Sequence, residues 1–117
     1  MKHFHIYFEQ HQQDELHSLL EITRRYFPTL YYGRIHTKPV GPHPIGSCLI
    51  ATKTEQETET LLGFLKQHHN NLTLMIHPLT GDDIEDHKAE NIIWLGQEYQ
   101  INRSIFYPKP THKYLKP

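Results

Sequence analysis

The sequence contains one cysteine, no excess of basic residues and no long apolar run, and each of these absences narrows the range of functions. Cys48 has no second cysteine to pair with, which favours a reducing compartment such as the cytoplasm. The chain has 12 lysines and arginines against 13 aspartates and glutamates, so it lacks the basic surface that attracts a nucleic-acid backbone. No segment approaches the roughly 18 apolar residues of a membrane span, and the N-terminal segment lacks the apolar centre of a signal peptide. We therefore expect a cytoplasmic protein that binds neither nucleic acid nor a membrane.

Histidine, by contrast, is abundant. Eleven of the 117 residues are histidines, and only His68 and His69 are adjacent, so this composition does not come from a purification tag. Imidazole changes its protonation near neutral pH and is a common ligand of transition metals. A histidine-rich chain with a net charge of -1 therefore points to metal binding or proton transfer.

Hydrophobic periodicity predicts four strands and two helices. Alternation of apolar and polar residues predicts strands at residues 3–9, 30–36, 45–51 and 72–77, and helical spacing predicts helices at residues 14–27 and 55–67. The order strand, helix, strand, strand, helix, strand is that of a ferredoxin-like βαββαβ sandwich. We therefore expect an α+β fold in which two helices cover one face of an antiparallel sheet.

The remaining chain is expected to extend this domain, which we assign to residues 1–106. Residues 82–90 read as a short acidic helix or turn, residues 92–95 as an extra C-terminal strand, and residues 98–101 could add a further edge strand. Residues 107–117 read as a basic, proline-rich tail.

The alternation also predicts where three histidines point. If Phe4 and Ile6 face the helices, then His5 faces the opposite side of the sheet, and the same parity places His77 and His36 on that side. The first and last strands of this fold are neighbours, so His5 and His77 should lie close together. Two or three converging imidazoles form a site for zinc, iron, copper or nickel. Alternatively, each is an ordinary surface or hydrogen-bonded histidine.

Other residues each allow two interpretations. His43 lies between Pro42 and Pro44, either as a catalytic group held by a stiff loop or as an exposed residue of a rigid connection. Asp82 or Asp83 either caps the following helix or completes a site of two histidines and one carboxylate. Cys48 is expected to be a small core residue rather than a nucleophile.

Several motifs together resemble the DOPA 4,5-dioxygenase family. They are His5-Ile6-Tyr7-Phe8, the Gly-Pro-His-Pro of residues 41–44, the run of residues 72–81 that ends in His-Pro-Leu-Thr-Gly, Asp82-Asp83, Asp86-His87 and Trp94-Leu95-Gly96. Their order and spacing match over about residues 3–101. The resemblance implies a ferredoxin-like fold, a homodimer, and extradiol cleavage of a DOPA-like catechol by non-haem Fe(II) and O2.

Such chemistry requires iron with open positions, and therefore about three protein ligands, beside a histidine that transfers protons. We predict His5 and His77 as ligands, with the third from His36 or His43, or from a carboxylate such as Asp82. His43 or His87 is the predicted acid–base group. Fe(II) is the expected metal, and zinc or another divalent metal can replace it in a purified sample. The alternative function is a non-catalytic module of the same fold that binds a metal or a small molecule.

A homodimer is also expected from the sheet itself. The face opposite the helices should carry Tyr7, Tyr32 and Met75, which would expose a large apolar surface in a monomer. We expect the interface on this face or on the segment after Trp94.

Overall fold

The four predicted strands and two predicted helices all form, and a fifth strand extends the sheet. The computed structural model describes residues 1–107. The main elements are β1 (Lys2–Phe8), α1 (Gln13–Tyr26), β2 (Tyr31–His36), β3 (Gly46–Thr52), α2 (Glu55–His68), β4 (Thr73–Pro78), α3 (Asp83–Asp86) and β5 (Ile93–Leu95). Short 3₁₀ turns lie at Gln10–Gln12, Ala89–Asn91 and Arg103–Phe106.

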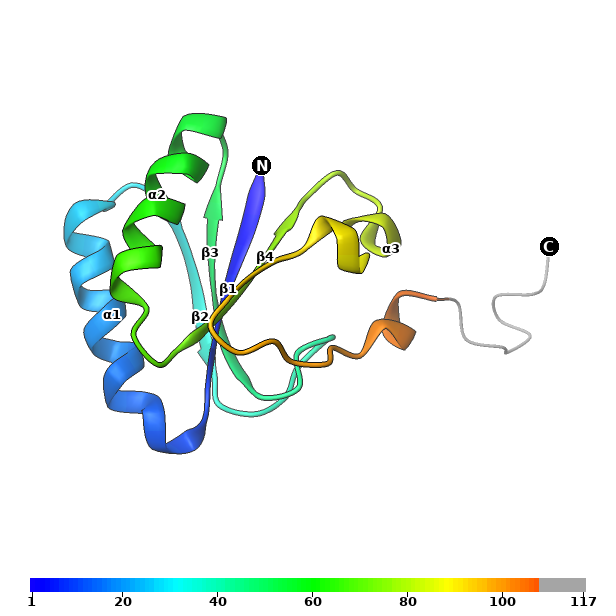
Figure 1. Cartoon of the computed structure of the whole chain (residues 1–117), viewed down its shortest axis with the longest axis horizontal. Coiled ribbons are helices and arrows are strands. Elements are labelled where there is room, and N and C mark those ends of the chain that lie inside the picture. Colours follow the sequence, from blue (N-terminus) through cyan, green and yellow to red (C-terminus); the bar gives the residue numbers. More distant parts are fainter. Residues whose placement is uncertain (108–117) are drawn as a thin grey trace.

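The sheet has the order β2-β3-β1-β4-β5, and every neighbouring pair is antiparallel. This order confirms the ferredoxin-like α+β sandwich with an extra C-terminal strand. The further edge strand expected at residues 98–101 does not form, and the chain is irregular there. Figure 1 shows α1 and α2 on one side of the sheet and α3 on the other.

The two long helices begin and end where local chemistry favours it. Thr54 precedes α2, where its hydroxyl accepts a hydrogen bond from the Glu57 N–H while the Glu57 carboxylate accepts one from the Thr54 N–H. This capping box satisfies two backbone donors at the start of the helix. The first helix ends before Pro28, which cannot continue an α-helix.

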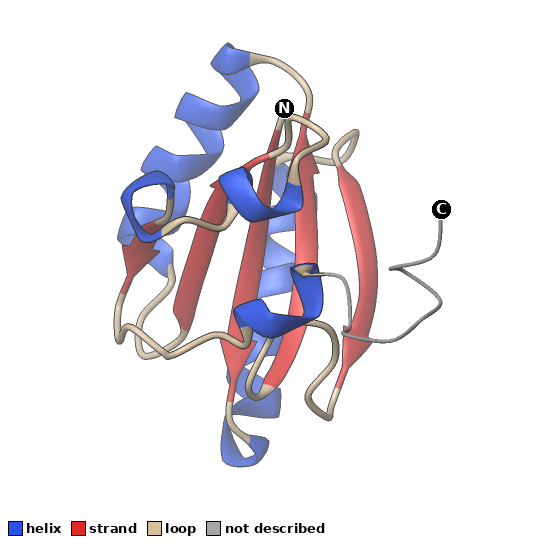
Figure 2. Ribbon diagram, turned by 90° about the vertical axis from the view of Figure 1, so that its right-hand side faces the viewer, coloured by secondary structure: helices blue, strands red, loops and turns tan. Residues whose placement is uncertain are grey.

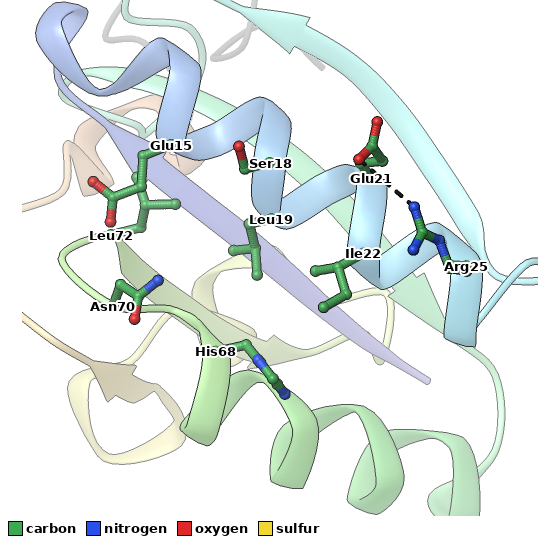
Figure 3. Close-up of a pocket in the computed structure, with 9 residues that line it drawn as sticks. All are labelled: Glu15, Ser18, Leu19, Glu21, Ile22, Arg25, His68, Asn70 and Leu72. Atoms are coloured by element: carbon green, nitrogen blue, oxygen red, sulfur yellow. Dashed lines mark ion pairs between the residues drawn. The ribbon is translucent and has the colours of Figure 1, made fainter.

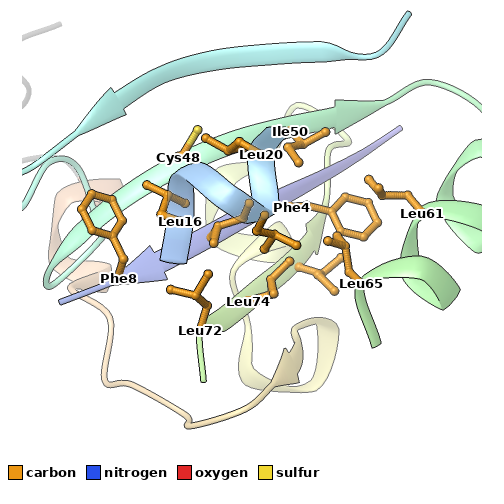
Figure 4. Packing of buried hydrophobic residues seen from close by; sticks show 13 residues of the cluster. Phe4, Phe8, Leu16, Leu20, Cys48, Ile50, Leu61, Leu65, Leu72 and Leu74 are labelled. Atoms are coloured by element: carbon orange, nitrogen blue, oxygen red, sulfur yellow. The ribbon is translucent and has the colours of Figure 1, made fainter. Parts of the chain in front are cut away.

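The main core lies between these helices and the sheet (Figure 4). Phe4, Ile6 and Phe8 of β1 point into it, because alternate strand residues share one face. Leucines of α1, of α2 and of the chain at and just before β4 belong to the same cluster: Leu16, Leu19, Leu20, Leu61, Leu65, Leu72 and Leu74. Cys48 lies in the same core with 1% of its surface exposed, which confirms its interpretation as a small core residue.

The alternation of β2 is interrupted. The pairing of β2 with β3 shifts register between Tyr32 and Ile35, and both of these side chains pack against the main core. Our placement of Tyr32 on the opposite face was therefore wrong, because the irregularity reverses the parity along the strand. His36 follows Ile35 and pairs with Ser47, so it lies on the predicted side of the sheet.

The sheet face opposite the long helices is covered rather than bare. Tyr7 and Met75 are 1% and 0% exposed, and they pack in a second cluster with Ile92 and Ile101. Figure 2 shows short helices and connecting loops in front of the strands. The large apolar exposure from which we expected a homodimer is therefore absent from the described residues, and the dimer stays a prediction.

Residues 96–102, the covering segment that follows β5, are held against the sheet by two hydrogen bonds. The hydroxyl of Tyr99 donates to the Glu9 carboxylate over 3.0 Å, and the N–H of Gln97 donates to the Thr73 hydroxyl over 3.0 Å. Just before Gln97 the chain passes so close to the start of β4 that a Cβ on Gly96, whose φ is +85°, would lie 3.0 Å from the Leu72 carbonyl oxygen. Glycine is therefore required at this position.

Of the predicted tail at residues 107–117, only Tyr107 lies within the described residues. Within the described part of the chain, no helix combines the length and apolar character needed to cross a bilayer. The cytoplasmic location stays a prediction.

Candidate metal centre

Three histidines converge on the covered face, where β1 lies beside β4. His3 is directly opposite His77 in the antiparallel register, and His5 lies two residues further along β1. One nitrogen from each of the three rings lies within 4.8 Å of the others. The Nε2 atoms of His5 and His77 are 3.0 Å apart. The arrangement can hold a metal ion, since imidazole is a ligand for zinc, iron, copper and nickel.

The orientation of His77 is fixed by the backbone. Its Nδ1 lies 2.7 Å from the Pro78 carbonyl oxygen, which can only accept a hydrogen bond. Nδ1 therefore carries the proton and Nε2 keeps its lone pair, which is directed at the other histidines. A second hydrogen bond of this kind is what orients metal-binding histidines in proteins.

Burial keeps these imidazoles neutral. It is the largest cause of a lowered pKa at His3, His5 and His77, and the neighbouring histidines lower the pKa further. The pKa of His77 falls to about 4, and that of His5 falls well below its ordinary value. A histidine must be unprotonated to bind a metal, so the site is ready to bind at neutral pH.

His43 reaches the same group from the loop between β2 and β3. A turn closed by the His43 N–H and the Val40 carbonyl sets its backbone, with Gly41 in the left-handed region at φ +57°. The ring centroid of His43 lies 4.2 Å from that of His5. Burial, followed by the nearby His77, lowers the pKa of His43 to about 4.

The Tyr7 hydroxyl lies 2.8 Å from Nδ1 of His43. Burial raises the pKa of Tyr7, so this hydroxyl keeps its proton. His43 therefore has a polar partner on the side of its ring that carries Nδ1.

His87 follows α3 and lies beside His77. Its ring centroid lies 4.0 Å from that of His77, and Phe106 stacks on its other side at 4.3 Å. Its Nδ1–H donates to the Asp83 carbonyl over 2.8 Å, so Nε2 keeps the lone pair. The Arg103 side chain donates to the His87 carbonyl, which ties the C-terminal segment to the site.

The model of the Dopa 4,5-dioxygenase family matches residues 3–105. The chain belongs to the Dopa 4,5-dioxygenase family. The resemblance inferred from the sequence motifs is thereby confirmed.

Two curated proteins are similar to most of this chain. The chain is 31% identical over 108 residues to the DOPA 4,5-dioxygenase of Amanita muscaria, a match of 86% of this chain and 46% of that protein. It is 27% identical over 110 residues to an uncharacterized 21.2 kDa protein of Botryotinia fuckeliana, covering 86% of this chain and 60% of the relative. The chain thus spans about half the length of the curated relatives that it matches.

A solved structure supports the fold. The crystal structure of a proposed dioxygenase from Nostoc punctiforme matches with a TM-score of 0.76 and 28% identity, covering 90% of this chain and 88% of that chain.

The sequence analysis identified part of this histidine group. His5 and His77 come together as expected, and His43 and His87 flank them. Among the described residues, however, the group of three contains His3 rather than His36. His3 shares the parity of His5, so the alternation of β1 contained the signal for it.

Of the carboxylates near the site, one acts as the sequence analysis predicted and another has a role that it missed. Asp82 caps α3 by accepting a hydrogen bond from the Glu85 N–H, which confirms its interpretation as a helix cap. The sequence analysis did not identify Asp86 as a structural residue. In the structure its side chain is fully buried, with 0% exposed. Its carboxylate accepts hydrogen bonds from the backbone N–H and the hydroxyl of Thr80, at 2.8 and 2.7 Å. Burial alone would raise the pKa of Asp86, but these hydrogen bonds hold it below its ordinary value.

A pocket of about 390 Å³ opens beside the histidine group. Its lining includes His5, His43 and His36, an apolar wall that contains Leu49, and the positively charged Arg34. None of its lining residues is a carboxylate. The pocket therefore suits a small aromatic molecule, and its one permanent charge favours an anionic one.

A second hollow of about 360 Å³ lies on the other side of the molecule, between α1 and the end of α2 (Figure 3). Its charged residues include Glu21 and Arg25, which form an exposed ion pair at 3.7 Å. None of the clustered histidines lines this hollow. It therefore has no part in the candidate centre.

Proposed function

We propose that the protein is an extradiol dioxygenase that opens the ring of a catechol with Fe(II) and O2. One observation carries the proposal: a group of three neutral histidines, with two further histidines beside it, borders a pocket of the size of a small aromatic molecule. Membership of the Dopa 4,5-dioxygenase family supports the same reaction class.

His5, His77 and His3 would hold the metal. Their neutral rings fit a divalent ion, because a neutral imidazole can bind a metal through one nitrogen while the other nitrogen keeps the proton. With three protein ligands, bound Fe(II) would supply coordination of the catechol oxygens and activation of O2. Zinc or another divalent metal can occupy the same ligands in a purified sample.

The flanking histidines would manage protons and orient the substrate. A catechol gives up a hydroxyl proton as it binds, and Nε2 of His87 has a lone pair that can accept it. His43 lines the pocket itself. The aromatic stacking of Phe106 on His87 keeps that imidazole in place.

The pocket also suggests how the substrate is oriented. Among the described residues, no carboxylate pairs with Arg34, so its guanidinium is available to an acidic group on the substrate. A catechol with a carboxylate on its side chain, as in DOPA, fits this distribution of charge.

Anaerobic loading with Fe(II), followed by air and a series of catechols, tests the proposal. An extradiol enzyme yields a yellow ring-opened semialdehyde, which is followed by its absorbance. Stoichiometric metal binding without any such product would favour the alternative of a non-catalytic metal-binding module.

A further inference from the structure

The histidines of the centre differ in the partner of Nδ1. In His77 and His87 this atom faces a backbone carbonyl, at 2.7 and 2.8 Å, so the proton is on Nδ1 and the lone pair on Nε2. In His43 the partner is the hydroxyl of Tyr7, at 2.8 Å, which can either donate or accept.

The burial of Tyr7 decides the direction of this hydrogen bond. Tyr7 is 1% exposed, and among the described residues its hydroxyl has no hydrogen-bond partner except His43. If His43 donated from Nδ1, the phenol proton would be buried without an acceptor, at a cost of about 1–3 kcal/mol. If Tyr7 donates, its phenol proton and Nδ1 of His43 satisfy each other. The proton of His43 is then on Nε2.

Nε2 of His43 borders open space. No buried side-chain nitrogen or oxygen of the described residues lacks a hydrogen-bond partner, and Nε2 of His43 has none among them, so it is not fully enclosed. His43 lines the pocket together with His5. The Nε2–H therefore faces a site where a bound molecule can accept a hydrogen bond.

We propose that Tyr7 is a positioning residue that holds His43 in the Nε2–H tautomer, so that His43 is a hydrogen-bond donor to the substrate and not a metal ligand. The tautomer follows from the contacts alone, whereas the substrate contact rests on the proposed dioxygenase function. The centre then presents lone pairs from His77 and His87 but an N–H from His43. A metal on Nε2 of His43 would move the proton of that ring to Nδ1, where it would leave the buried Tyr7 hydroxyl without an acceptor, and this cost argues against His43 as the third metal ligand.

Nitrogen-15 NMR of the imidazole rings tests the tautomer directly. We would record long-range proton–nitrogen spectra of the metal-free and zinc-loaded protein at pH 8, and assign His43 by comparison with His43→Gln. In both states His43 should show a protonated Nε2 and an unprotonated Nδ1. A proton on Nδ1 of His43, in either state, would overturn the proposal.

Tyr7→Phe tests the role of the hydroxyl, and Tyr99→Phe is its matched control. Both tyrosines belong to the same cluster, with ring centroids 5.7 Å apart, but the Tyr99 hydroxyl bonds to Glu9. Tyr7→Phe should move the chemical shift of Nδ1 in His43 toward the value of an unprotonated nitrogen that accepts no hydrogen bond. Tyr99→Phe should leave this chemical shift unchanged. An unchanged resonance in Tyr7→Phe would refute the assigned hydrogen bond.

Metal content and turnover separate this inference from the proposed function. Tyr7→Phe and His43→Gln should retain one zinc per chain, while turnover in Tyr7→Phe falls about 10- to 100-fold. Loss of zinc from His43→Gln, or full turnover in Tyr7→Phe, would show the assigned role to be wrong. If no catechol is cleaved by the wild type, the dioxygenase proposal fails, but the NMR result still decides the tautomer.

Discussion

Nε2 of His5 lies 3.0 Å from Nε2 of His77, although 72 positions of the chain separate the two residues. They are not direct partners in the sheet: His5 pairs with Met75, and His77 pairs with His3. Diagonal neighbours on antiparallel strands are close enough for imidazole rings to meet. The register of β1 against β4 therefore creates the contact, and a shift by one residue would turn one ring to the other face.

The first prediction concerns the ligands. His77→Gln and His3→Gln should each weaken zinc binding by more than about 100-fold, because loss of a ligand costs more than loss of a residue that merely orients one. Glutamine is preferable to alanine, since His77 is only 2% exposed and a truncation would leave a cavity. Anaerobic calorimetric titration with Fe(II), and with zinc as a stable substitute, measures the affinity.

His36→Gln is the control for these variants and should retain the metal, because His36 lies outside the group of three. If His36→Gln lost the metal while His3→Gln kept it, His36 would be the third ligand that the sequence analysis predicted.

The sequence predicted the part of this centre that depends on strand alternation. Tyr7 shares the parity of His5, so its place on the covered face followed from the same pattern. The contact between Tyr7 and His43 did not, because it joins a strand to a loop whose path is set by the turn at Gly41. The shift in β2 was equally hidden, since strand propensity carries no signal for an irregular register.

The covering segment was missed for a different reason. Residues 96–102 form neither helix nor strand, so they have no periodic pattern from which packing could be predicted. Their position depends on single contacts, such as the hydrogen bond from Asn102 to the Pro42 carbonyl at 2.8 Å. Such contacts between distant loops become visible only in three dimensions.

The second prediction concerns the loop that carries His87. Asp86→Asn should lower the free energy of unfolding by about 1–3 kcal/mol, because an amide nitrogen would then face one of the two donors of Thr80. Urea unfolding of the metal-free protein measures the change. Asp83→Asn is the control in the same short helix: its side chain is exposed, and the effect should stay within about 0.5 kcal/mol. Equal effects of the two substitutions would contradict the structural role of Asp86.

The third prediction concerns substrate charge. Arg34→Gln should raise KM about fivefold for a catechol that carries a carboxylate, corresponding to the roughly 1 kcal/mol of an exposed ion pair. The KM for unsubstituted catechol should not change, since that molecule offers no partner for the guanidinium. Arg25→Gln, which alters an arginine on the far side of the sheet, should affect neither substrate. A parallel rise in KM for both catechols would mean that Arg34 shapes the pocket rather than binds the carboxylate.

The last prediction follows from the lowered pKa values of His43 and His77. Each falls from 6.5 to about 4 on folding, mainly through burial. At a pH between these two pKa values, each histidine is protonated in the unfolded chain but not in the folded chain, so acidification favours unfolding. At pH 5 each histidine should have cost the metal-free protein about 2 kcal/mol of stability relative to pH 7.5.

Urea unfolding at the two pH values measures this loss, and the same comparison on His77→Gln isolates one contribution. That variant should be less sensitive to pH, because glutamine binds no proton in either state. Saturating zinc at pH 7.5 should stabilise the wild type further. The stability of the zinc-loaded protein should fall more steeply as the pH is lowered, because protons then compete with the metal for the same lone pairs. If the wild type and His77→Gln lost the same stability on acidification, folding would not lower the pKa of His77, and the burial of its neutral ring would not resist protonation as proposed.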